Sequence, residues 1–163
     1  MNQLSHFDDS GASRMVDVSE KEVTQRFARA SGNIRLAKET LSLIRNRNMA
    51  KGDVLEVARI AGISGAKRTA DLIPLCHILP LESVEINFDF PDQETIRIEA
   101  ITRVTGRTGV EMEAIVAVTT TAMTIYDMCK AIDRGMVVEQ IQLEEKSGGR
   151  SGHFIRAAPD SIR

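Results

Sequence analysis

Aromatic side chains are scarce in this sequence. Phe, Tyr and Trp make up 4% of the residues, and there is no Trp. Proteins that bind single-stranded nucleic acid commonly stack bases on aromatic rings, so we expect no nucleic-acid partner. With 42% hydrophobic residues among 163, the chain can still build an aliphatic and Met-rich core. We expect one domain over residues 14–158, between tails at residues 1–13 and 159–163.

Cysteines, long apolar runs and metal-ligand spacings are also few or missing. Cys76 and Cys129 are the only cysteines, too few for a disulfide scaffold and typical of a reducing compartment. No apolar run approaches the roughly 20 residues that span a bilayer, and no export signal is visible. The three His and two Cys show neither HExxH nor CxxC spacing. These absences predict a cytoplasmic protein with no membrane partner and no metal site.

Charge is distributed unevenly along the chain. Residues 21–70 carry 11 Lys/Arg against 4 Asp/Glu, a balance of +7, whereas residues 82–145 carry 5 against 13, a balance of −8. One interpretation is solvated faces of opposite sign. The other is that the basic half holds an anionic ligand while the opposite charges help subunits to associate. No sustained basic stripe indicates nucleic acid.

The hydrophobic pattern predicts a mixture of helices and strands. Residues 84–90 alternate strictly between apolar and polar, residues 91–93 form a turn signal, and residues 95–104 return as a partner strand. The remaining expected elements are strands at 137–143 and 153–156, and helices at 36–44, 53–61 and 66–72. The pattern of residues 21–35 is ambiguous, and we favour a strand there. Antiparallel hairpins with segregated helices indicate an α+β fold, a ferredoxin-like antiparallel sheet with helices packed on one face.

The longest predicted helix runs from Gly109 to Arg134. Thr108 and Glu111 have the spacing of a capping box, and Gly135 is a plausible end. Carboxylates stand near both ends of this helix, and the helical rise separates Glu113 from Asp127 by roughly 21 Å. The two groups can therefore serve one pocket only if the ligand is long or a second chain closes the gap.

Asp127 and Lys130 lie one helical turn apart. The spacing is that of an ordinary surface ion pair. It also suits proton transfer, because a buried or crowded Lys can lose its proton near neutral pH and act as a base or acid. Both interpretations remain open on spacing alone.

Several cations lie where an anion could bind. Lys51 precedes a predicted helix start at Asp53, where Asp53 and Glu56 have the spacing of a helix cap. Lys67 and Arg68 occupy the start of the next short helix, and backbone amides at helix starts attract anions. Lys146 opens a Gly-rich basic loop that ends at Gly152 and lacks Walker A spacing. Solvated lysines and a flexible linker are the alternatives.

Leu75, Cys76 and His77 follow directly on Pro74. His77 could donate to a phosphate, move protons near neutral pH, or be a hydrogen-bonded structural residue. Cys76 and His77 are adjacent, so in extended chain they point to opposite sides, which weakens a Cys–His nucleophile pair. Taken together, the cations and carboxylates suggest proton-transfer chemistry on a polyphosphorylated substrate.

Seven segments in order make the chain resemble the cyclic pyranopterin monophosphate synthase family, also called MoaC. The segments are Met15–Ser19, Lys51–Asp53, Ala66–Thr69, Asp71–His77, Thr105–Ala114, Thr124–Lys130 and Lys146–Gly152. They extend over nearly the whole chain. The resemblance implies conversion of 3',8-cyclo-7,8-dihydro-GTP to cyclic pyranopterin monophosphate with release of pyrophosphate. It implies no required cofactor, with Mg²⁺ as a possible companion of the triphosphate.

The resemblance also implies residue roles and an assembly. It makes Lys51, Asp127 and Lys130 the catalytic residues. The resemblance assigns substrate binding to Leu75, Cys76, His77, Met112 and Glu113. It also implies that Lys67, Arg68 and Lys146 contact the triphosphate. The family is ferredoxin-like and forms hexamers, trimers of dimers with sites at the dimer interface, which agrees with the distance between the two ends of the long helix.

One position departs from the family pattern. The family usually has Pro after the Cys-His pair, where this chain has Ile78 and places Pro at position 80, so we expect a less rigid loop after His77. Two other functions remain as alternatives: a cyclohydrolase that acts on GTP directly, and a non-catalytic nucleotide-binding oligomer.

Overall fold

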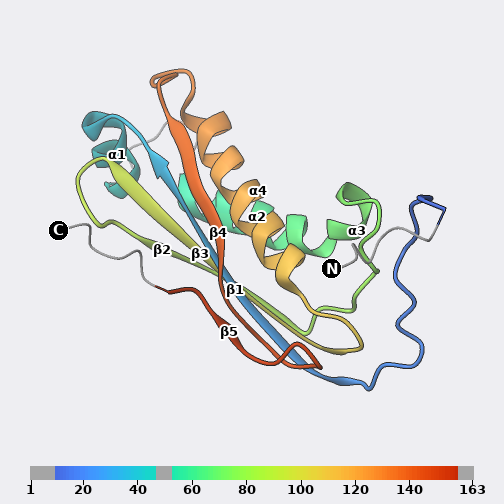
Figure 1. The fold of residues 1–163 in the computed structure, drawn as a ribbon. Helices are drawn as coiled ribbons and strands as arrows, with labels where there is room; N and C mark the ends of the chain where they lie inside the picture. Colours follow the sequence, from blue (N-terminus) through green and yellow to red (C-terminus); the bar gives the residue numbers. More distant parts are fainter. Residues whose placement is uncertain (1–9, 47–52, 158–163) are drawn as a thin grey trace.

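Five antiparallel strands form one sheet, and the helices cover one of its faces (Figure 1). The computed structural model describes residues 10–46 and 53–157. In chain order the elements are β1 Thr24–Arg35, α1 Lys38–Arg45, α2 Val54–Lys67, α3 Thr69–Leu72, β2 Ser83–Asp89, β3 Thr95–Gly106, α4 Glu111–Cys129, β4 Val137–Ser147 and β5 Phe154–Ile155. Each helix and strand expected from the sequence has a counterpart, with shifted bounds.

The strand order is β2-β3-β1-β4-β5. β1 pairs with β3 along its whole length, with Ala30 opposite Ala100. The helices α1 to α3 connect β1 to β2, and α4 connects β3 to β4. With β4, β1, β3 and β2 side by side in this order, the connections are those of a ferredoxin-like sheet. The predicted α+β fold is confirmed.

The core lies between the sheet and α4, and small residues bring these layers close together. Ala28 and Ala30 on β1 and Ala117 on α4 are fully buried. A Cβ at Gly32 would stand 2.8 Å from the Val118 side chain, and one at Gly62 of α2 would stand 2.1 Å from Thr121 Oγ1 of α4. Glycine at these positions therefore sets how closely α4 approaches β1 and α2.

The ends of α2 confirm one expectation and correct another. Asp53 caps the helix, since its side chain accepts the Glu56 amide at 3.2 Å. The helix, however, continues to Lys67, six residues beyond the predicted end at Ala61. Packing of Gly62 and Gly65 against α4 outweighs their low helix propensity. Lys67 thus ends α2 and does not begin the next helix.

The long helix α4 is shorter at both ends than the sequence suggested. It begins at Glu111 after Val110, and no side chain caps its first turn. The predicted capping box from Thr108 is therefore wrong. The helix ends at Cys129, with Lys130 as its C-cap, so the predicted extension to Arg134 and the stop at Gly135 are wrong as well.

The two oppositely charged halves of the sequence meet on neighbouring strands. Arg29 of β1 pairs with Glu99 of β3 at 3.1 Å and with Glu145 of β4 at 3.2 Å. A further pair, Arg97 of β3 with Glu144 of β4 at 2.9 Å, lies within the acidic half and reaches across β1. Part of the charge asymmetry is therefore neutralised within the chain, across the sheet.

Candidate active site

A cavity of about 300 Å³ lies where the segment after α3 meets the start of α4, and we call it the inner pocket. Its wall consists of Val16, Val18, Lys21, Leu75, Cys76, His77, Leu79, Thr108, Gly109, Glu111, Met112 and Glu113. The structure thus gathers in one wall all five residues that the sequence grouped as the Cys-His segment and the Met-Glu pair.

Glu113 is the buried acid of the inner pocket. It lies in the first turn of α4 and is only 4% exposed. Burial raises the pKa of its carboxyl to about 7, opposed by its own backbone amide and assisted by the negative charge of Glu111. Burial, with the charge of Glu113, also raises the pKa of the Cys76 thiol. Near neutral pH the pocket therefore holds a thiol and a carboxyl that can donate a hydrogen bond.

His77 holds the N-terminal part of the chain against the inner pocket. Its Nε2 lies 2.9 Å from the Val16 carbonyl oxygen. A carbonyl only accepts, so Nε2 carries the proton and Nδ1 of the neutral ring is an acceptor. At the other end of this segment, Arg107 Nε donates to the Lys21 carbonyl at 3.1 Å. Residues 16–21, which we call the strap, are thus anchored at both ends.

A second cavity of about 610 Å³ adjoins the inner pocket, and we call it the basic pocket. The two cavities share Lys21, Thr108, Gly109 and Glu111 in their walls. The basic pocket adds the charged residues Glu22, Arg26, Arg107 and Arg150. Four cations thus face two carboxylates, which favours an anionic ligand.

The strand β1 and the Gly-rich loop build the basic pocket together. Arg26 is only 8% exposed, and its Nε donates to the Gly106 carbonyl at 3.1 Å. The loop passes directly over the guanidinium, since a Cβ at Gly149 would stand 1.6 Å from Arg26 Nη1. Gly148 and Gly149 have φ of 98° and 73°, which favour glycine. These glycines let the backbone lie against a buried cation.

Lys146 lies at the base of this loop and outside both pockets. It belongs to β4, and its Nζ donates to the Ser151 hydroxyl. Ser151 itself lines the basic pocket beside Arg150. The Gly-rich loop singled out in the sequence thus reaches the basic pocket, but within the described residues the arginines Arg26, Arg107 and Arg150, and not Lys146, line this cavity.

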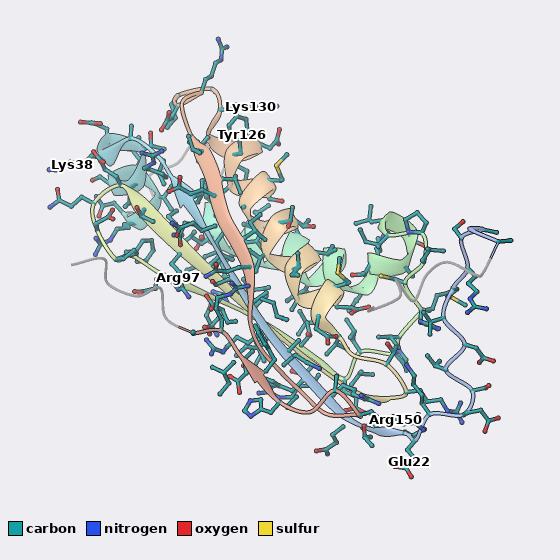
Figure 2. The ribbon with its side chains drawn as sticks, viewed as in Figure 1. Glu22, Lys38, Arg97, Tyr126, Lys130 and Arg150 are labelled. Carbon is teal, nitrogen blue, oxygen red and sulfur yellow. The ribbon has the colours of Figure 1, made fainter. Side chains whose placement is uncertain are left out.

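The Asp127–Lys130 pair lies at the other end of α4. Lys130 Nζ donates to Asp127 Oδ1 at 2.7 Å, and both side chains are more than half exposed. This hydrogen bond raises the pKa of Lys130. The sequence left open a crowded Lys130 that loses its proton near neutral pH. In a single chain Lys130 is instead exposed, and Asp127 stabilises its protonated form. Figure 2 labels Lys130 and Arg150 at opposite ends of the molecule.

The sequence from residue 15 to residue 149 matches the model of the MoaC family. The chain belongs to the MoaC family. It is 55% identical over 154 residues to the cyclic pyranopterin monophosphate synthase of Desulfitobacterium hafniense, covering 94% of each chain. It is 56% identical to cyclic pyranopterin monophosphate synthase 1 of Mycobacterium bovis over 157 residues, which cover 96% of this chain and 92% of that one. The synthase of Magnetococcus marinus is 56% identical over 162 residues, 98% and 99% of the two chains.

Three further residues were expected to act on substrate in this MoaC family member, Lys51, Lys67 and Arg68, and neither Lys67 nor Arg68 lines either pocket. Lys51 lies outside the described residues. Lys67 and Arg68 are exposed at the junction of α2 and α3. A helix C-terminus carries partial negative charge, so the anion-binding argument made for Lys67 at a helix start does not hold.

Ile78 stands where the family resemblance led us to expect Pro. Its side chain is 89% exposed, so it adds little packing to the loop. The hydrogen bond from His77 to the Val16 carbonyl nevertheless orients the imidazole. The position of His77 thus depends on the strap rather than on a rigid residue after it.

Within the described residues, no group of three or more His, Cys, Asp or Glu side chains is arranged to hold a metal ion. Nor does any helix there have the length and apolar character needed to cross a membrane.

Proposed function

We propose that this protein converts 3',8-cyclo-7,8-dihydro-GTP to cyclic pyranopterin monophosphate and releases pyrophosphate, a lyase reaction of molybdenum cofactor biosynthesis. Membership of the MoaC family and about 55% identity to named synthases over nearly the whole chain support it. The observation that carries the proposal within the structure is the pair of adjoining cavities, one with a buried acid and one with four cations.

The two cavities suit the two parts of this substrate. We assign the fused ring system to the inner pocket, where Glu113, Cys76 and His77 Nδ1 offer hydrogen-bond donors and an acceptor. We assign the triphosphate to the basic pocket, where Arg26, Arg107 and Arg150 offer guanidinium groups suited to phosphate oxygens. The shared wall at Lys21 then lies beside the α-phosphate.

Formation of a cyclic phosphate with loss of pyrophosphate defines part of the chemistry. A sugar hydroxyl oxygen bonds to the α-phosphorus, the bond from that phosphorus to the bridging oxygen breaks, and the hydroxyl proton passes to a base. Cations stabilise the negative charge that develops on the departing pyrophosphate. The basic pocket provides these cations.

We assign the proton transfers to Lys51, Lys130 and Asp127. Asp127 holds Lys130 in its protonated form, so Lys130 begins as the acid and Lys51 takes the complementary role of base. Asp127 orients the ammonium group and stabilises its charge. No resident cofactor enters this scheme, and Mg²⁺ accompanies only the substrate triphosphate.

Both ends of α4 act on one substrate only if a second copy of the chain contributes. Glu113 and Asp127 are 14 residues apart on the helix, about 21 Å along its axis. We therefore propose a homo-oligomer, a hexamer built as a trimer of dimers, with each site between two chains. Exposed apolar side chains such as Ile60 on α2 and Met123 on α4, 64% and 57% exposed, are available for such contacts. We place the protein in the cytoplasm, where its two free cysteines remain reduced.

Incubation of the purified protein with 3',8-cyclo-7,8-dihydro-GTP tests the proposal. We expect pyrophosphate release together with a fluorescent pterin after oxidation. EDTA should lower activity only as far as it removes Mg²⁺ from the substrate triphosphate. Turnover of GTP itself would instead identify a cyclohydrolase. Tight binding of the cyclised nucleotide without either product would identify a non-catalytic binding protein.

A further inference from the structure

The turn between α4 and β4 is tied to the start of α1 by one side chain. Asp133 Oδ2 accepts the Ala37 backbone amide at 2.7 Å, and Asp133 Oδ1 accepts the Gly135 amide at 3.0 Å. The residues joined by the first bond are 96 positions apart in the sequence. One carboxylate thus connects two segments that the chain itself keeps distant.

The helix α1 has no cap of its own. Ala37 occupies its N-cap position and offers no side-chain acceptor. Backbone amides at a helix start need partners, and a capping carboxylate typically contributes about 1 kcal/mol. Asp133 places a carboxylate at the Ala37 amide from outside the helix. The tie therefore affects the position of α1 as well as the turn.

The same turn carries Lys130. Its amide donates to the Tyr126 carbonyl at 2.8 Å, and the Asp133 amide donates to the Cys129 carbonyl at 3.0 Å, so residues 130–133 continue directly from the last turn of α4. The Lys130 ammonium is exposed, and its bond to Asp127 orients it. The direction of this turn consequently sets where Lys130 points, and Figure 2 places Lys130 and Lys38, the first residue of α1, toward the same end of the molecule.

We propose that Asp133 is a positioning residue for the reaction, which fixes the Lys130 turn of α4 relative to α1. The inference rests on the proposed function, in which Lys130 transfers a proton. In the sequence Lys51 follows the last residue of α1 by six positions. Asp133 therefore links the turn after α4, which carries Lys130, to α1, the helix that precedes Lys51 in the sequence.

The variant Asp133→Ala removes both bonds and tests the proposal. A misplacement of about 1 Å at a reacting group can cost on the order of 100-fold, so we expect kcat for 3',8-cyclo-7,8-dihydro-GTP to fall roughly 10- to 100-fold. The cavities lie at the other end of α4, so KM should change little. Asp133→Asn keeps one acceptor oxygen and should recover part of the lost kcat.

Asp92 provides a matched control in the turn between β2 and β3. Its carboxylate also makes two bonds, from the Glu94 amide at 2.8 Å and from the Thr95 hydroxyl at 3.0 Å, without reaching α4. Asp92→Ala should lower the melting temperature by a similar amount and leave kcat near wild type. Faster hydrogen exchange at the Ala37 amide in Asp133→Ala, but not in Asp92→Ala, would confirm loss of the tie.

The outcomes separate this inference from the proposed function. If wild type and Lys130→Ala differ in turnover as expected but Asp133→Ala keeps wild-type kcat, or loses no more than Asp92→Ala, the positioning role is wrong and the proposed function stands. If the wild-type protein does not convert the substrate, both are wrong.

Discussion

The two ends of α4 differ in almost every physical respect. At the N-terminal end, Glu113 is buried, its pKa is raised to about 7, and two cavities adjoin it. At the C-terminal end, Asp127 and Lys130 are exposed and charged, and their hydrogen bond raises the pKa of the lysine. The N-terminal end adjoins cavities that can hold a ligand, whereas the C-terminal end presents an exposed ion pair. Under the proposed function, binding and proton transfer thus fall in separate places of one chain, and the proposed assembly joins them.

Removal of the amine at the exposed end should have the largest effect. We expect Lys130→Ala to lower kcat by roughly 100- to 10,000-fold, the usual contribution of a general acid or base, while the dissociation constant for substrate changes little. Pyrophosphate release and equilibrium binding measure the two quantities. Equal losses of binding and turnover would assign Lys130 to substrate binding and remove the contrast between the ends.

Removal of the buried cation at the cavity end should act on binding instead. Arg26→Ala removes a guanidinium from the basic pocket, and a hydrogen bond to a charged group contributes about 1.5–3 kcal/mol, so we expect substrate affinity to fall roughly 10- to 100-fold. Arg35→Ala on the same strand is the control, because Arg35 is exposed and pairs only loosely with Glu139 at 3.6 Å. A similar loss of affinity in both variants would contradict the assignment of the basic pocket.

Burial of Glu113 should make stability depend on pH. The folded protein raises the pKa from 4.5 to about 7, so folding favours the protonated carboxyl. The free energy of unfolding of wild type should fall as pH rises from about 4.5 to about 7, by on the order of 2 kcal/mol. Glu113→Gln cannot ionise and should lose less stability over this range. Denaturation curves at pH 5 and pH 8 measure the free energy of unfolding of both proteins. If it changes by the same amount in wild type and in Glu113→Gln, ionisation of Glu113 does not destabilise the fold and the prediction is wrong.

The Gly-rich loop allows the smallest and most local test. Gly149→Ala strains a residue with φ of 73° and pushes a methyl group into the Arg26 guanidinium, so we expect substrate KM to rise roughly five- to tenfold, a part of the Arg26 effect. Gly152 has φ of 65° with open space around its Cβ position. Gly152→Ala should therefore raise KM less. Equal changes would attribute the effect to backbone strain alone.

Local patterns in the sequence predicted the parts of the fold that local chemistry controls. The Asp53 cap and the hairpin of β2 and β3 were found because a capping side chain and strict alternation act over a few residues. The full length of α2 was not predicted, because Gly62 and Gly65 are poor helix formers, and they occur in this helix where it packs closely against α4. The capping box at Thr108 failed for a similar reason: Thr108 and Gly109 line the pockets, and α4 starts after Val110.

The candidate site was predicted in part for the same reason. The Cys-His segment and the Met-Glu pair came from motifs, and the structure places them in one wall. Arg26 had no motif to mark it, because its position depends on tertiary contact with Gly106 and with the loop at Gly149. The strap and its bonds to His77 and Arg107 likewise join segments far apart in the sequence.

Mixing of the Arg26→Ala and Lys130→Ala variants tests most directly whether each site draws on two chains. Arg26→Ala binds substrate weakly and Lys130→Ala lacks the proton-transfer group, so at substrate concentrations well below the wild-type KM each alone should turn over substrate poorly. After co-expression, random assembly in a symmetric oligomer should give about a quarter of the sites a complete set from two different chains, with activity to match. Recovery near that level would support the two-chain site. No recovery in verified mixed oligomers would contradict it and require both ends of α4 to act within one chain.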